Sequence, residues 1–118
     1  AIYNLEQIKE TPENYTKKFF TPIYEGQEPL YSVKDDVKKL VTLRKLNLLE
    51  LNSSCNNRFD IIFCRNVMIY FDFETRQELI NKYYNMLTIG GYLFLSHAET
   101  LSGKNHKFRF VQPAVYQK

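Results

Sequence analysis

Polar side chains stand at three points of the sequence where a run of strand-forming residues ends. In chain order these points are Asn47-Leu48, Arg65-Asn66 and Ser96-His97. In an open α/β sheet, ligands bind beyond the carboxyl ends of the strands. Polar groups that follow a buried strand are costly unless they find partners, either in the protein or in a ligand. The spacing therefore predicts a polar ligand edge at these strand ends.

Each of these side chains also has an interpretation that needs no ligand. Arg65 can form a local salt bridge, and Asn66 can cap the turn after its strand. Asn47 can bond to its own backbone, or it can offer a donor and an acceptor to a flat heterocycle. From the residue types alone, both interpretations stay open for all three residues.

Other residues near these points carry weaker indications of chemistry. His97 and Glu99 could act in metal binding or acid–base chemistry, but neither has a partner at a suitable spacing. The favoured interpretation of His97 is therefore a loop histidine whose hydrogen bonds are satisfied. Tyr70 and Phe71 stand just before a predicted helix, where aromatic side chains most often belong to the core.

Several chemical motifs are missing from the sequence. It has no Gly-rich phosphate loop, no zincin motif and no nucleophile elbow. Its two cysteines, Cys55 and Cys64, make no metal or disulfide framework, and we expect both to be reduced thiols. No metal site is predicted.

The composition is that of a soluble globular domain. Of 118 residues, 44% are hydrophobic and 25% are charged, which excludes a disordered tail and a disulfide-rich mini-protein. No apolar run approaches the roughly 20 residues that a membrane-spanning helix needs. The net charge of +3 is spread along the chain, so that no nucleic-acid-binding face is indicated.

The first half of the chain predicts short elements around a turn-rich connection. Thr11-Pro12 is typical of a helix start, and Tyr15 and Phe19 follow at an i,i+4 spacing. We expect a helical stretch over 1–20, a strand over 30–33, a helical turn over 34–40 and a strand over 41–47.

The second half predicts a strand–helix–strand unit. The apolar run 59–64 is typical of a parallel strand that is buried on both faces. Asp72 can cap a helix over 73–87, which Gly90-Gly91 would end. Further strands are expected over 92–96, 108–111 and 114–116, of which the last two form an antiparallel pair.

One stretch carries a more specific signal. The string FDIIFCRNVMIYFD at 59–72, followed by ETRQELINKYYNML, IGGYLFLSHAET and AVYQK, resembles the chemotaxis-receptor glutamate methyltransferases, the CheR family. The upstream LRKLNLLE and the first twenty residues are also similar to that family. The resemblance implies an α/β fold, the C-terminal part of a class I (Rossmann-like) methyltransferase domain. A small β insert would lie within residues 21–46.

The resemblance also implies an activity and a set of site residues. Such an enzyme transfers the methyl group of S-adenosylmethionine (SAM) to glutamate side chains on the cytoplasmic helices of chemoreceptors, leaving S-adenosylhomocysteine. By position, Asn47 and Leu48 would lie at the adenine, and Arg65 and Asn66 would line the cofactor pocket. Tyr70, the candidate catalytic residue, would face the methyl group and the substrate carboxylate. We expect a cytoplasmic protein with no nucleic-acid partner and no membrane insertion.

Methyl transfer to a carboxylate suits this set of residues. A glutamate carboxyl has a pKa of about 4.3, so it is already ionised at neutral pH and needs no strong general base. The reaction needs in-line alignment, and positioning of this kind contributes about 7–11 kcal/mol. The residues Arg65, Asn66 and Tyr70 are suited to such orientation.

Part of the family's domain has no counterpart in this sequence. In the family, a helical N-terminal domain, the Gly-rich cofactor loop, the acidic ribose ligand and an arginine implicated in catalysis all lie further upstream. In the family's strand order, the two strands that are missing here lie in the sheet between the strand at 41–47 and the strand at 59–64, so we expect an unpaired sheet edge. We therefore expect the chain alone to bind SAM weakly or not at all, unless another chain or a swapped copy fills the gap.

Two other functions fit the same residues. An inactive binding module or adaptor would keep the fold and dispense with the upstream motif. A methyltransferase with a different substrate would use the same cofactor site. The presence of a Gly-rich turn upstream favours an enzyme, and its absence favours the adaptor.

Overall fold

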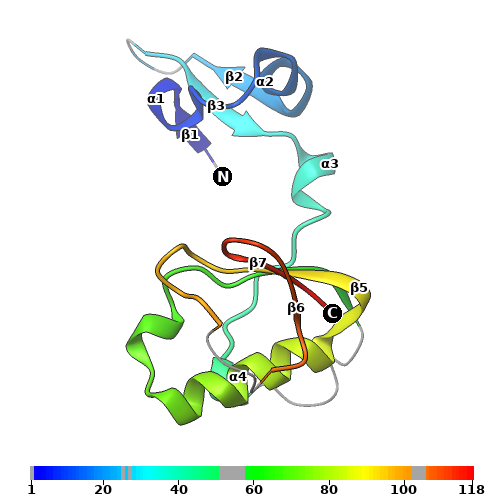
Figure 1. Cartoon of the computed structure of the whole chain (residues 1–118). Helices are drawn as coiled ribbons and strands as arrows, with labels where there is room; N and C mark the ends of the chain where they lie inside the picture. Colours follow the sequence, from blue (N-terminus) through cyan, green and yellow to red (C-terminus); the bar gives the residue numbers. More distant parts are fainter. Residues whose placement is uncertain (1, 25, 27, 51–57, 102–105) are drawn as a thin grey trace. The chain divides into compact units, whose positions relative to one another are not determined.

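A computed structural model describes residues 2–24, 26, 28–50, 58–101 and 106–118 (Figure 1). The chain divides into two compact units, Ala1–Arg44 and Lys45–Lys118. Each unit has its own sheet, and the five predicted site residues all belong to the second unit.

The first unit is built on a three-stranded antiparallel sheet in the order β1-β3-β2. Its strands are β1 (Ile2–Asn4), β2 (Phe20–Ile23) and β3 (Leu30–Val33), and its helices are α1 (Leu5–Ile8), α2 (Glu13–Phe19) and α3 (Asp35–Lys38). A reciprocal capping box of Asn4 and Gln7 starts α1. The predicted strand over 30–33 and the helical turn within 34–40 are confirmed.

The prediction of helix over all of 1–20 is wrong at the start of the chain. Ile2–Asn4 is a strand, because it pairs with β3 and places Ile2 opposite Ser32. The helical part consists of α1, which begins at Leu5, and α2, which begins at Glu13, where Pro12 takes the N-cap position without a side-chain hydrogen bond. The i,i+4 pair is confirmed, with the ring centroids of Tyr15 and Phe19 5.8 Å apart.

The predicted strand over 41–47 is not formed. The backbone there is irregular, and Leu43 is 90% exposed. A strand needs a partner for its backbone groups, and among the described residues this segment has none. The alternation of apolar and polar residues over 41–47 therefore did not lead to a strand, because no described strand pairs with this segment.

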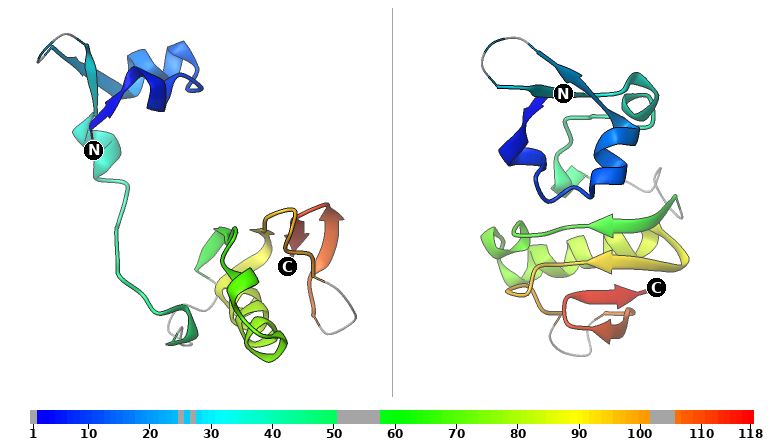
Figure 2. Two further views of the ribbon diagram at one scale, coloured as in Figure 1. Left: turned by 90° about the vertical axis from the view of Figure 1, so that its left-hand side faces the viewer. Right: turned by 90° about the horizontal axis from the view of Figure 1, so that it is seen from above.

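The second unit holds a four-stranded sheet in the order β4-β5-β7-β6. The strands are β4 (Phe59–Phe63), β5 (Leu87–Phe94), β6 (Arg109–Gln112) and β7 (Val115–Gln117). The helix α4 (Phe73–Met86) joins β4 to the parallel strand β5 and lies across one face of the sheet (Figure 2). Two short 3-10 turns, η1 (Leu48–Glu50) and η3 (Met68–Tyr70), flank β4. The predicted strand–helix–strand unit and the final antiparallel pair are confirmed.

The core of this unit lies between α4 and the sheet. Leu79, Ile80, Tyr83 and Met86 on α4 are buried in one cluster with Leu93 of β5. Burial of such a side chain contributes about 1.5–3 kcal/mol, so this interface holds the helix in place. As predicted, Asp72 caps α4, accepting a hydrogen bond from the Thr75 amide at 2.8 Å.

The strand β4 forms the outer edge of the sheet in the described part of the chain, as the family's strand order implied. The prediction that β4 is buried on both faces is wrong. Ile61 and Phe63 are 50% and 70% exposed, because α4 covers only the opposite face. Within the residues that the structure describes, β4 therefore presents both an unpaired edge and an uncovered apolar face.

Gly90 and Gly91 do not end the helix as predicted, because α4 already ends at Met86 and the chain enters β5 directly. Gly90 has φ +82° at a point where the register between β4 and β5 shifts. A Cβ on Gly91 would lie 2.9 Å from the Asp60 carbonyl oxygen and 3.0 Å from that of Thr88. The two glycines therefore shape the bend in β5 and its close approach to β4.

Replacement of Gly91 by alanine should lower the free energy of unfolding by about 1–3 kcal/mol, because two backbone carbonyls block the new methyl group. Urea denaturation measures the change. Gly90→Asn is the comparison variant, because the nearest atom to its Cβ is 3.9 Å away and asparagine reduces the strain of φ +82°, so this change should lower the free energy of unfolding by less than Gly91→Ala does. Equal stability of Gly91→Ala and the unsubstituted chain would contradict the prediction.

Candidate functional site

A depression of about 430 Å³ lies beside β4 in the second unit. It brings together Leu48 of η1 and Arg65, which follows β4, on walls supplied by the strand and by Tyr83 and Met86 of α4. The turn η1 is fixed to α4 because the Lys82 ammonium donates to the Leu49 carbonyl oxygen at 2.5 Å. Two of the five predicted site residues therefore share one apolar depression with a guanidinium at its rim.

Asn47 precedes Leu48, which lines this depression, but the Asn47 side chain forms hydrogen bonds within its own turn. Its side-chain nitrogen donates to Glu50 Oε1 at 3.0 Å, and its side-chain oxygen accepts from the Leu49 amide at 3.1 Å. This is the backbone-capping interpretation of Asn47, and it explains why η1 starts where it does. Its assignment to an adenine stays a prediction.

Asn66 and Tyr70 lie on the turn that follows Arg65, outside the lining of the depression. Asn66 has φ +57°, a left-handed conformation that asparagine tolerates better than most residues. Tyr70 is 80% exposed, so its interpretation as a core aromatic is wrong, whereas Phe71 packs against the core. The roles predicted for Asn66 and Tyr70 are not tested by this geometry.

The residue that organises this turn is Glu99, to which no role was assigned from the sequence. Its side chain is 5% exposed. Oε1 accepts from the amides of Val67 and Met68 at 2.9 and 2.7 Å. Oε2 accepts from the Asn66 amide at 2.9 Å, and from the amide and hydroxyl of Ser96 at 3.1 and 2.7 Å. Both oxygens of the carboxylate are thus fully used within the protein.

The hydrogen bonds decide the protonation state of Glu99. Burial raises the pKa of its carboxyl, but the bonds from Ser96, Asn66 and Met68 lower it by more, so its pKa lies below the usual value. The group is therefore an ionised hydrogen-bond acceptor at neutral pH. A residue search by type would miss it, because four of its five donors are backbone amides. The one signal in the sequence is Ser96 three residues before an acidic residue, after a buried strand.

His97 is exposed and lies on the turn between Ser96 and Glu99. With Arg65 it lines a second depression, of about 280 Å³, whose other side is the turn between β6 and β7. Within the described ranges, no group of three or more metal-ligating side chains comes together.

Cys64 also lines the larger depression, and its partner is Tyr83. The Tyr83 hydroxyl donates to Cys64 Sγ at 3.3 Å. Burial raises the pKa of both groups, so the thiol is protonated and is not poised as a nucleophile. The other cysteine, Cys55, lies outside the described residues.

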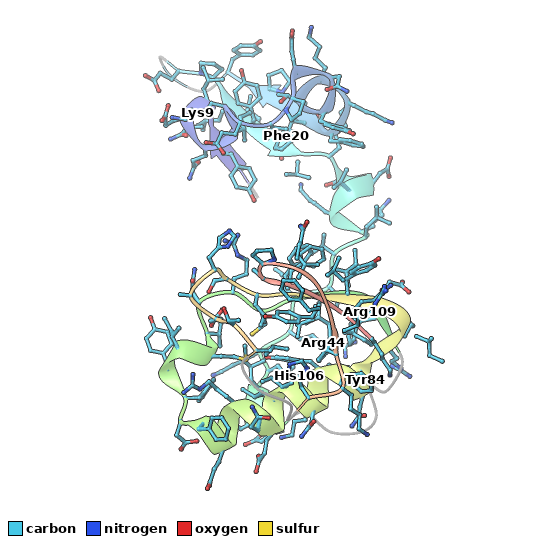
Figure 3. The ribbon with its side chains drawn as sticks, in the orientation of Figure 1. Lys9, Phe20, Arg44, Tyr84, His106 and Arg109 are labelled. Atoms are coloured by element: carbon cyan, nitrogen blue, oxygen red, sulfur yellow. The ribbon has the colours of Figure 1, made fainter. Side chains whose placement is uncertain are left out.

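Figure 3 draws the side chains of both units. The labelled Tyr84 side chain, on α4, packs edge-on against Phe108, with ring centroids 5.2 Å apart. Lys107 and Lys118 lie over the Tyr84 ring. This cluster joins α4 to the residues just before β6 and just after β7.

Comparison with known proteins identifies the family of the sequence. The family model described as "CheR methyltransferase, SAM binding domain" matches residues 1–117. A chemotaxis protein methyltransferase of Borreliella burgdorferi is 38% identical over 118 residues, covering 100% of this chain and 40% of the relative. The chemotaxis protein methyltransferase of Escherichia coli is 34% identical over 116 residues, covering 98% and 41%.

The chain spans about two fifths of the length of these curated relatives. A shorter match, 46% identical over 80 residues, is to chemotaxis protein methyltransferase 1 of Vibrio cholerae, with 68% of this chain and 29% of the relative covered. None of the helices in the described part of the chain has the length and apolar character needed to cross a membrane.

The Glu99 carboxylate makes the stability of the second unit depend on pH. Because its pKa is lowered by folding, its contribution is present above the unfolded value of about 4.3 and is lost as the pH falls through the folded value. Urea denaturation at pH 7 and at acidic pH should therefore show a smaller acid-induced loss for Glu99→Gln than for the unsubstituted chain. An equal loss in both would contradict the prediction. Glu78→Gln, at an exposed position of α4, is the control.

Proposed function

Because the chain belongs to the CheR methyltransferase family and matches its SAM-binding domain, we propose that the protein methylates glutamate side chains of chemoreceptors with SAM. The products would be glutamyl methyl esters and S-adenosylhomocysteine. The family match over residues 1–117 is the observation that carries this proposal. The printed names of the relatives, chemotaxis protein methyltransferases, support it. We place the reaction in the cytoplasm, where the receptor helices that it modifies would lie.

The depression beside β4 has a chemistry that suits part of this cofactor. Leu48 gives an apolar wall for a flat ring, and Arg65 gives a guanidinium that can pair with the carboxylate of an amino acid. Asn47 would contribute at the adenine if its amide exchanged its bond with Glu50 for one with the ring. Asn66 would line the same pocket from the turn after β4. When bound, SAM supplies an electrophilic methyl group on a sulfonium centre.

The residues of this chain would bind and orient the reactants. The glutamate that accepts the methyl group is ionised at neutral pH, so no side chain has to remove a proton from it. Tyr70 has an exposed hydroxyl that can donate a hydrogen bond to one oxygen of that carboxylate and leave the other free to attack. Tyr70 is therefore the residue that we propose to contact the substrate.

We propose that the cofactor site is completed by polypeptide beyond this chain. The unpaired edge of β4 and the exposed Ile61 and Phe63 are consistent with a sheet that continues past β4. A second copy of the chain, swapped or associated through this edge, is the alternative source of the missing wall. Either source would enclose a site that is open in the isolated chain.

Calorimetric titration of SAM tests the division of the site. The 118-residue chain should bind weakly or not at all, and a version extended at its N-terminus to the length of the relatives should bind. Submillimolar binding by the chain alone would contradict the proposal that its site is incomplete. Failure of the extended protein to bind would favour the adaptor function instead.

Substitution of Tyr70 by phenylalanine tests the proposed contact with substrate. Transfer of labelled methyl groups to receptor fragments should fall by about tenfold or more, because the orienting hydroxyl is lost. Stability should not change, since the side chain is 80% exposed. Tyr24→Phe, at an equally exposed position in the first unit, is the matched control.

Receptor fragments with Glu→Ala changes at the methylation sites separate this substrate from others. They should accept no methyl group, while methylation that persists on them would indicate a different substrate.

For Tyr70→Phe, the assay is made in the extended protein. Full methyl-transfer activity of Tyr70→Phe in that protein would contradict the role given to this residue.

A further inference from the structure

Two turns at the carboxyl ends of β4 and β5 are tied together by one buried carboxylate. Three consecutive amides of the first turn, those of Asn66, Val67 and Met68, donate to Glu99. The second turn contributes the amide and the hydroxyl of Ser96 to the same carboxylate. It is closed by a hydrogen bond of 2.9 Å from the Glu99 amide to the Ser96 carbonyl oxygen. Glu99 is thus shared by both turns.

The backbone of the first turn is shaped around this charge. Successive amides that point inward form a concavity that binds an anion, and a left-handed residue at its start is part of that geometry. Asn66, with φ +57°, provides that conformation. Charge-assisted hydrogen bonds of this kind are roughly twice as strong as neutral ones. The conformation of 66–68 therefore depends on the carboxylate of Glu99.

Each turn carries a cationic or titratable side chain to the same depression. Arg65 directly precedes the three amides, and His97 lies between Ser96 and Glu99. Both line the depression of about 280 Å³ at this end of the sheet, and Arg65 also lines the larger one. A shift of the first turn would move Arg65, which lines both the proposed cofactor site and the depression that it shares with His97.

We propose that Glu99 is a positioning residue for cofactor binding, which acts by locking the turn that carries Arg65 and Asn66 to the turn that carries His97. The inference rests on the proposed function, because it is the binding of SAM that the locked turn would serve. Glu99 itself does not touch the ligand, since both of its oxygens are occupied by protein donors. Its effect passes through the backbone of 65–68.

The first test is spectroscopic and needs no ligand. In the 118-residue chain, Glu99→Gln should move the amide proton signals of Asn66, Val67 and Met68 upfield, because the charged acceptor is replaced by a neutral one. The same change at the exposed Glu78 should leave these signals in place. Unmoved signals in a folded Glu99→Gln variant would overturn the proposal.

The second test measures affinity in the protein extended to the length of its relatives. Calorimetry should show the Kd for SAM rising by about tenfold or more in Glu99→Gln, by analogy with the cost of small misplacements in a binding site. Glu78→Gln should bind as the unsubstituted protein does. Equal affinity of folded Glu99→Gln and the unsubstituted protein would overturn the positioning role.

A conservative variant keeps the proposal testable if Glu99→Gln does not fold. Glu99→Asp keeps the charge on a shorter side chain. It should therefore shift the three amide signals by less than Glu99→Gln does. Its Kd for SAM should lie between that of the unsubstituted protein and that of a neutral variant. A folded Asp variant with moved amide signals and unchanged Kd would overturn the proposal. If the unsubstituted extended protein binds no SAM, the proposed function fails and the inference fails with it. If the extended protein binds SAM and the Glu99→Gln variant binds it with the same Kd, the inference fails and the proposed function stands.

Discussion

The buried carboxylate of Glu99 is the interaction on which the polar edge of the second unit depends. It satisfies five donors from two turns that stand more than two dozen residues apart in the sequence. Without it, three consecutive amides beside the core would lack an acceptor, which costs more than the gain from a typical hydrogen bond. The fold can bury this charge because four backbone amides and the Ser96 hydroxyl donate hydrogen bonds to it.

The rest of the unit supplies the rigid frame that this carboxylate needs. The helix α4 packs Leu79, Ile80 and Tyr83 against β5, which fixes the strand that leads to Ser96. The parallel pairing of β4 with β5 brings the end of β4 to the same side. Donors that follow β4 and β5 can then bond to one acceptor, the Glu99 carboxylate. The candidate site is a consequence of strand direction as much as of residue type.

Elements whose signals lie within a few residues of one another were predicted correctly from the sequence. Features that depend on a pairing or packing partner elsewhere in the fold were predicted wrongly. The helix α4, its Asp72 cap and the parallel strands were recognisable, because apolar spacing and a capping residue lie within a few positions of one another. Burial of β4 and the strand over 41–47 were predicted wrongly, because both depend on neighbours that the described chain does not provide. Tyr70 was favoured as a core residue by type and became a site candidate only through the family resemblance. Glu99 was missed because backbone amides leave no mark in a residue pattern.

The filled concavity at 66–68 also bears on which small molecules the end of β4 can select. In many nucleotide-binding proteins, free amides at a strand end capture a phosphate group. Here the equivalent donors are already taken by a carboxylate of the protein itself. A phosphorylated nucleotide would find no free donors on this turn and would meet a fixed negative charge. The three amides of 66–68 are therefore not available to a phosphate group, and binding of an anion at this strand end is left to side chains such as Arg65.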